Sequence, residues 1–160
     1  MAGHIMTKGN YKIQVYNRTQ SKADELVQNG ADFKSPIEIA KDVDYLFLML
    51  GYPHDVEEMV LDKDNGILAH MKKGAYLIDH TTSTPELAAR IATQAEKNGV
   101  KSVDAPVSGG DIGAKGGCVV TMCGGAAEDI DHLRFLLDFY SKEVQHMGPP
   151  GSGQHTKMAN

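Results

Sequence analysis

The chain has 160 residues, of which 41% are hydrophobic and 23% charged, with a formal net charge of −5. This composition is ordinary for one globular domain, and the negative charge with scattered basic residues argues against binding of nucleic acid. The longest apolar run, residues 45–50, is too short to cross a membrane, and no signal peptide begins the chain. We therefore expect a cytoplasmic protein that binds neither membrane nor nucleic acid, although an organellar location stays open.

Short apolar runs alternate with segments of helical periodicity along the chain. Strands are expected at residues 12–16, 31–33, 45–50, 75–79, 102–107, 119–123 and 144–147. Helices are expected at residues 1–8, 21–28, 53–61, 85–98 and 127–140, and another begins at Pro36. This alternation predicts an α/β fold with a doubly wound, mostly parallel sheet and with ligands at the carboxyl ends of the strands.

A glycine-rich stretch follows the fifth expected strand, at residues 104–110. There the Ser108 hydroxyl and the backbone N–H groups of Gly109 and Gly110 are suited to binding an anion such as a carboxylate. The alternative is a simple turn between two strands.

A second glycine cluster, at residues 148–153, leads into a helix-like segment that carries Lys157 and Asn160. These two residues are three positions apart, which brings a cation and an amide to one helix face. The two glycine clusters together suggest one site, although an isolated lysine on a helix is usually solvated.

Cysteine and histidine residues give no sign of a metal or a disulfide. Cys118 and Cys123 are five positions apart in an extended run, so their side chains would point to opposite faces. The seven histidines are dispersed and lack the spacing of zinc ligands. We expect no metal site and two free thiols.

The two glycine motifs resemble those of the β-hydroxyacid dehydrogenase family. Residues 104–114, Asp-Ala-Pro-Val-Ser-Gly-Gly-Asp-Ile-Gly-Ala, are similar to the family's substrate-binding motif, and Gly148-x-x-Gly151-x-Gly153-x-x-x-Lys157 is similar to its catalytic motif. The family includes 3-hydroxyisobutyrate dehydrogenase and semialdehyde reductases, with 6-phosphogluconate dehydrogenase as a distant relative. The resemblance implies a Rossmann-like fold.

The resemblance also implies roles for individual residues. Lys157 would be the general acid and base, while Ser108 with Gly109 and Gly110 would hold a substrate carboxylate. Asn160 would hydrogen-bond a substrate oxygen, although some relatives place this asparagine one position later. The substrate would be a small molecule that carries a carboxylate.

The cofactor is expected to be NADP rather than NAD. Where an acidic residue would bind the ribose 2′-hydroxyl of NAD, the chain has Asn17, Arg18 and Thr19, with Lys22 nearby. These side chains suit a 2′-phosphate, although a solvated basic turn is the alternative. Further cofactor contacts implied by the resemblance are Met49, Leu50 and Thr82.

The chain departs from the family pattern at its ends. We expect residues 1–160 to form an NADP-binding domain that is incomplete at the N-terminus, because a first strand and the G-x-G-x-x-G loop are not found. The family's C-terminal helical dimerisation domain is also expected to be absent. For a complete protein we expect a homo-oligomer.

The leading hypothesis is an NADP-dependent oxidoreductase that moves hydride between nicotinamide and a small 3-hydroxyacid or its semialdehyde. The alternative is a catalytically inactive nucleotide-binding fragment or association module. Imine reductases share the cofactor-binding half but lack the family lysine, so Lys157 argues against them.

Overall fold

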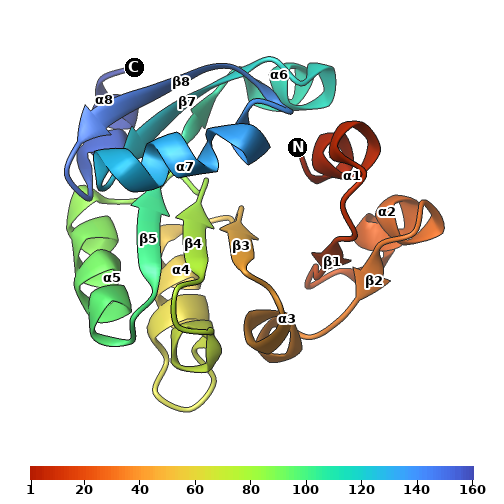
Figure 1. The fold of residues 1–160 in the computed structure, drawn as a ribbon, viewed down its shortest axis with the longest axis horizontal. Coiled ribbons are helices and arrows are strands. Elements are labelled where there is room, and N and C mark those ends of the chain that lie inside the picture. Colours follow the sequence, from red (N-terminus) through yellow and green to blue (C-terminus); the bar gives the residue numbers. More distant parts are fainter.

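The structure, a computed structural model, describes residues 1–160 as alternating strands and helices (Figure 1). The strands are β1 (Gln14–Val15), β2 (Asp32–Phe33), β3 (Tyr45–Leu48), β4 (Tyr76–Asp79), β5 (Lys101–Asp104), β6 (Val107–Ser108), β7 (Val119–Gly124) and β8 (Ser141–Gly148). The α-helices are α1 (Ala2–Gly9), α2 (Asp24–Gln28), α3 (Pro36–Asp42), α4 (Pro53–Leu61), α5 (Pro85–Lys97), α6 (Gly110–Gly116), α7 (Ala127–Leu137) and α8 (Ser152–Ala159). Short 3-10 helices cover Gln20–Ala23 and Ile67–His70.

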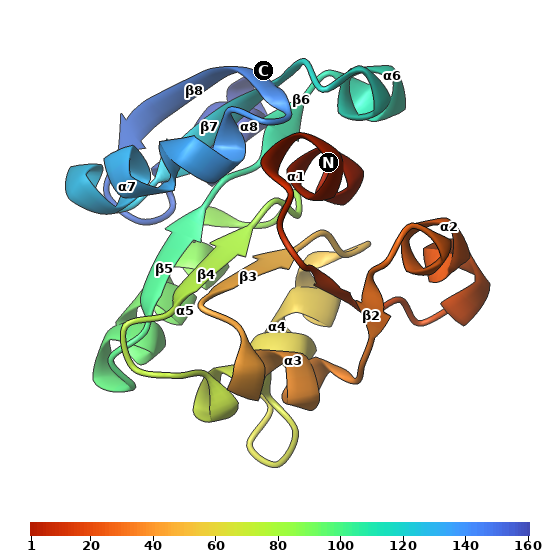
Figure 2. The same ribbon diagram turned by 45° about the vertical axis from the view of Figure 1, so that its right-hand side comes forward.

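The strands form two sheets. A six-stranded sheet has the order β3-β4-β5-β7-β6, and its sixth strand, β8, also pairs with β7. Strands β1 and β2 form a separate parallel pair. Four of the six strand pairings are parallel, and β7 runs antiparallel to β5 and β6. The expected α/β, Rossmann-like fold with a mostly parallel sheet is confirmed. In both views β3 lies between β4 and the β1–β2 pair (Figures 1 and 2).

The six-stranded sheet separates two hydrophobic cores. Successive side chains of a strand point to opposite faces, so Leu77 of β4 packs with α3, α4 and α5 while its neighbour Ile78 packs with α7. All four residues of β4 are buried. Burial on both faces explains why β3 and β4 have almost continuously apolar sequences.

The parallel strands end level with one another. Leu48 of β3 pairs with Asp79 of β4, and Asp79 pairs with Asp104 of β5. The three segments that follow these strands therefore leave the sheet along one edge, as expected for a ligand-binding edge of a parallel sheet.

Two features near this edge differ from the sequence prediction. The single strand expected at residues 102–107 is two strands, because the chain leaves the ladder at Ala105 and Pro106, and proline has no N–H to donate. The glycine-rich residues that follow Ser108 form helix α6, which was not expected. Helix α5 agrees well: the Thr84 hydroxyl accepts from Leu87 N, as predicted for its N-cap.

No helix of the fold is both long and apolar enough to cross a membrane.

Candidate cofactor and substrate site

Ser108 and Asn160 lie in direct contact at the end of β6. Asn160 Nδ2 donates a hydrogen bond to Ser108 Oγ over 3.1 Å. The position of Ser108 is set by its pairing with Val120 of β7, and Asn160 directly follows α8. Gly109 then turns the exposed backbone away from the strand with a φ of 133°, which an L side chain rarely adopts. A hydroxyl, an amide and an accessible backbone are thus brought together.

Lys157 lies in the last turn of α8, about one helical turn before Asn160. Its side chain is half-buried, and its ammonium group has no hydrogen-bond or ion-pair partner in the structure. Because residues three apart share a helix face, Lys157 and Asn160 are presented to the same side. The ammonium is therefore free to contact a ligand.

The start of α8 is fixed by the buried carboxylate of Asp104, the last residue of β5. Asp104 Oδ1 accepts from Gly151 N over 2.7 Å and Oδ2 accepts from Gln154 N over 3.0 Å. A Cβ at Gly153 would overlap Asp104 and the Met122 carbonyl, so only glycine allows this approach. Burial raises the pKa of Asp104, while the backbone N–H donors favour its ionised form and oppose that change.

The β4–α5 loop is fixed by Gln154, whose side chain is fully buried. Gln154 Oε1 accepts from Ser83 N and Nε2 donates to the Thr81 carbonyl, each over 2.8 Å. Thr82, between these two bonded residues, is exposed. The loop thus presents the Thr82 side chain outward from a fixed backbone.

The end of β3 is tied to the same loop. Leu50 N donates to Thr81 Oγ1 over 2.9 Å, and Thr81 N donates to the Asp79 carboxylate over 2.9 Å. Met49 is exposed and Leu50 is half-buried, so both can contact a ligand. Burial raises the pKa of Asp79 to about 6.

The four basic and polar residues expected to bind a 2′-phosphate lie apart from this network, after β1. Asn17, Arg18, Thr19 and Lys22 are all exposed. Asn17 Oδ1 accepts from Thr19 N over 2.9 Å, which shapes the turn. The Arg18 and Lys22 side chains have no carboxylate partner, and no hydrogen bond joins this turn to the loops after β3 and β4.

His80, the residue directly after β4, forms hydrogen bonds through both of its ring nitrogens. Its Nδ1 lies 2.6 Å from the Ala105 carbonyl, so Nδ1 carries the proton, and Nε2 accepts from Tyr140 Oη over 2.7 Å. The ring also stacks on Phe47 at 5.7 Å. Complete burial lowers the pKa of His80 to about 4, so it is neutral at physiological pH. Its bond to the Ala105 carbonyl holds the residue directly before Pro106.

Sequence reasoning assigned no site role to Asp104 or Gln154, and it placed His80 and Thr81 at the ligand edge only as neighbours of Thr82. Asp104 and Gln154 stand inside the two glycine motifs, but their partners are 47 to 73 residues away along the chain. The sequence signal that could have identified Asp104 is a polar residue at the end of a buried strand, because a buried polar group usually needs a hydrogen-bond partner.

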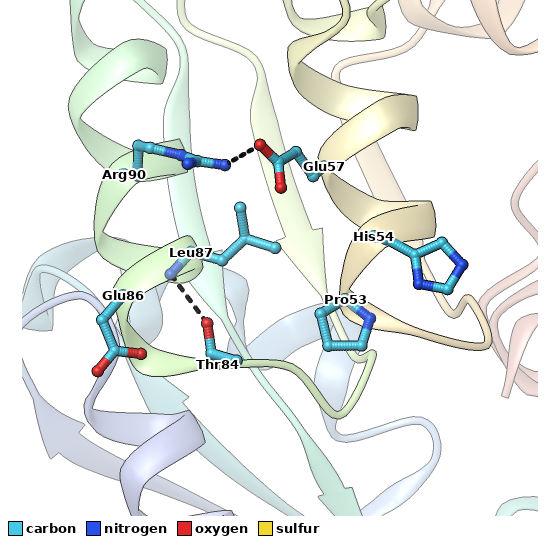
Figure 3. A pocket seen from close by; sticks show the side chains of 7 residues that line it. All are labelled: Pro53, His54, Glu57, Thr84, Glu86, Leu87 and Arg90. Atoms are coloured by element: carbon cyan, nitrogen blue, oxygen red, sulfur yellow. Dashed lines mark hydrogen bonds and ion pairs between the residues drawn. The ribbon is translucent and has the colours of Figure 1, made fainter.

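A surface cavity of about 510 Å³ lies elsewhere, between α4 and α5 (Figure 3). Its lining includes the Arg90–Glu57 ion pair, 2.5 Å long, and the capping residue Thr84. None of the predicted site residues lines it. With one apolar lining residue and a self-paired arginine, this cavity offers little to hold a small ligand.

Comparison with known proteins shows the family of the chain. The family model described as the NAD binding domain of 6-phosphogluconate dehydrogenase matches residues 1–148. A probable 3-hydroxyisobutyrate dehydrogenase-like 1 of Arabidopsis thaliana is 42% identical over the whole chain, and an NAD-dependent L-serine dehydrogenase of Pseudomonas aeruginosa is 35% identical. The chain belongs to the β-hydroxyacid dehydrogenase family. It comprises the NAD-binding domain of that family.

Solved structures of other proteins have the same fold. A Mycobacterium tuberculosis 3-hydroxyisobutyrate dehydrogenase with L-serine superposes with a TM-score of 0.90 at 25% identity, over 98% of this chain and 53% of that one. Psf3 in complex with NADP+ and 2-OPP gives a TM-score of 0.92 at 26% identity, over 98% of this chain and 56% of that one. A Streptomyces aurantiacus imine reductase, 22% identical, shares the fold alone.

The chain spans about half the length of the curated relatives it matches. It covers 48% of the Arabidopsis protein, 53% of the Pseudomonas enzyme and 55% of an uncharacterized oxidoreductase, YkwC, of Bacillus subtilis, which is 45% identical to it.

We predict that acid weakens this β-hydroxyacid dehydrogenase domain through His80. The unfolded chain binds a proton near pH 6.5 that the folded domain excludes until about pH 4, so the free energy of unfolding falls as pH drops across that interval. His80→Asn removes this titration. The difference in free energy of unfolding between the unsubstituted protein and His80→Asn, measured by urea unfolding, should therefore decrease by about 2 kcal/mol when the pH is lowered from about 8 to about 5.

His155→Gln, which replaces an exposed histidine without a side-chain hydrogen bond, is the control. A His80→Asn deficit that stays constant or grows on acidification would contradict the assignment of a neutral, buried His80.

Proposed function

We propose that the protein containing this chain is an NADP-dependent oxidoreductase that interconverts a small 3-hydroxyacid and its semialdehyde. The observation that carries the proposal is the hydrogen bond from Asn160 Nδ2 to Ser108 Oγ, with Lys157 three residues before Asn160 on α8. The family membership of the chain supports the same reaction class.

The substrate carboxylate would bind to the Ser108 hydroxyl and to the backbone N–H groups of Gly109 and Gly110. Asn160, whose amide already reaches Ser108 Oγ, would donate to a substrate oxygen. This arrangement fixes one end of a short molecule and leaves its other end near the Lys157 ammonium. Orientation of this kind contributes to rate by removing unproductive arrangements.

Lys157 would act as the general acid and base. During reduction its ammonium gives a proton to the carbonyl oxygen as that oxygen gains charge, and during oxidation the free amine removes the proton from the hydroxyl. The nicotinamide cofactor, when bound, supplies or accepts the hydride. The absence of a protein partner for the ammonium suits a group that must bind substrate oxygen.

The donor set after β1 fits the 2′-phosphate of NADP. Arg18 and Lys22 offer an exposed guanidinium and ammonium, Asn17 and Thr19 offer polar groups, and no carboxylate pairs with either cation. Met49, Leu50 and Thr82 would contact other parts of the cofactor. Psf3, a neighbour in structure, binds NADP+, whereas the name of the Pseudomonas relative specifies NAD.

The names of two relatives favour the substrate class. Both 3-hydroxyisobutyrate and L-serine are short acids with a hydroxyl group on the third carbon. In each the carboxylate and the reacting carbon are separated by one carbon, which fits a site with an anion-binding turn close to the acid/base group.

Substitution of Lys157 tests the acid/base role. In the full-length native protein, Lys157→Ala should lower kcat for semialdehyde reduction by about 100-fold or more while the Kd for NADPH changes little, because the lysine acts on the substrate. Steady-state kinetics and nicotinamide fluorescence measure the two quantities. Lys142→Ala, an exposed lysine on β8, is the matched control, and an unchanged kcat in Lys157→Ala would remove this residue from the mechanism.

Substitution of Arg18 tests the cofactor preference. Arg18→Asp should raise the Kd for NADPH by about 10-fold or more and that for NADH much less, since the new carboxylate repels only the 2′-phosphate. Lys12→Asp makes the same change in net charge just before β1 and should leave the ratio of the two Kd values unchanged. An equal loss for both cofactors in Arg18→Asp would overturn the preference for NADP.

A further inference from the structure

Gln154 is a fully buried amide whose two ends are both used. Its side chain has no exposed surface, Oε1 accepts from Ser83 N, and Nε2 donates to the Thr81 carbonyl. An amide is costly to bury, so its retention in the interior requires that both ends be paired, as they are here.

The two bonds of this amide enclose a single residue of the β4–α5 loop, Thr82. The bonded backbone atoms belong to its two neighbours, Thr81 and Ser83, and both neighbours are buried while Thr82 is exposed. Gln154 thus fixes the loop on both sides of the exposed Thr82. The Thr81 hydroxyl extends the connection to Leu50 N.

Gln154 also lies about one helical turn before Lys157 on α8. A rigid helix rises about 1.5 Å per residue, so three residues place Lys157 about 4.5 Å further along the axis. The backbone of Gln154 is itself held by Asp104 Oδ2, and Asp104 Oδ1 holds Gly151 N. The start of α8 is therefore fixed to β5 by its backbone and to the β4–α5 loop by one side chain.

We propose that Gln154 is a positioning residue that sets the Lys157 amine relative to the cofactor-contacting loop at Thr82. Asp104 acts with it by anchoring the N-terminus of α8. The inference rests on the proposed function, because it concerns the geometry of that reaction. A helix and a loop that each fold correctly but shift against one another would bind substrate and cofactor and still react slowly.

Substitution of Gln154 by glutamate gives a sharp test, because a protonated carboxyl group has the shape and bonding pattern of the amide. When ionised, the new carboxylate accepts from Ser83 N but faces the Thr81 carbonyl without a donor. Burial raises the pKa of such a group, so it gains its proton within the range of an enzyme assay. Once protonated, it donates to the Thr81 carbonyl as the amide does.

In the full-length native protein, Gln154→Glu should lower kcat by about 10- to 100-fold near pH 9, with less than a threefold change in KM for substrate or in Kd for NADPH. The ratio of its kcat to that of the unsubstituted protein should rise toward one as the pH falls to about 6. Circular dichroism at the assay temperature ensures that kcat is expressed per folded molecule. Gln94→Glu, on the exposed face of α5, is the matched control and should keep a ratio near one throughout.

Asp104→Asn provides a second variant in case Gln154→Glu does not fold. It keeps the shape of the side chain but turns one acceptor into a donor that faces a backbone N–H, so kcat should fall without recovery on acidification. An unchanged kcat in folded Asp104→Asn would then overturn the proposal.

The results with Gln154→Glu and with Lys157→Ala together decide between the positioning role and the proposed function. A kcat ratio like that of Gln94→Glu at every pH, or a deficit that does not depend on pH, overturns the positioning role alone. A protein whose activity survives Lys157→Ala overturns the proposed function and the positioning role with it. A deficit that is relieved by acid, in a protein inactivated by Lys157→Ala, supports both.

Discussion

The site depends on one buried interaction, the Asp104 carboxylate at the N-terminus of α8. The N–H group of Gly151, the residue before α8, and that of Gln154, in its first turn, point at the two carboxylate oxygens. The carboxylate thereby pairs a donor at the helix start and lies at the positive end of the helix. Burial raises the pKa of Asp104, and these donors, which favour the ionised form, offset part of that rise. Because Asp104 ends β5, the helix that carries Lys157 is attached to the strand that leads to Ser108.

The other parts of the site follow from that attachment. With α8 fixed on the sheet, Asn160 reaches Ser108 and Gln154 reaches the loop at Thr82. Four segments far apart in sequence thereby share one polar network at the level ends of three parallel strands. An unpaired polar group in the interior costs free energy, so a shift that breaks these hydrogen bonds is unfavourable. The network therefore fixes the relative positions of its members.

Much of the fold was predictable because its signals are local. Residues 76–78 are apolar on both faces of the sheet, as expected for a central strand, and Thr84 with Pro85 marks the start of α5. Helix α6 was missed because glycines 110, 113 and 116 disfavour a helix by intrinsic propensity. Tertiary packing decides that segment: Gly113 is buried against Val119 of β7, and a Cβ there would make an ordinary van der Waals contact with it at 3.5 Å.

The site was predictable only in part, for a physical reason. Ser108, Asn160 and Lys157 have chemistry that a motif reveals, whereas Asp104 and Gln154 act through backbone groups 47 to 73 residues away. Backbone donors and acceptors are the same at every residue, so the sequence does not say which of them a buried side chain will bond. Only the packed structure identifies these partners.

The most direct test of this account is a crystal structure of the full-length protein with NADP+ and a 3-hydroxyacid. The account predicts a substrate carboxylate on Ser108 Oγ and the N–H groups of Gly109 and Gly110, with the substrate hydroxyl within hydrogen-bond distance of Lys157 Nζ. A substrate bound away from Ser108, for example in the cavity between α4 and α5, with Lys157 still unpaired, would contradict it.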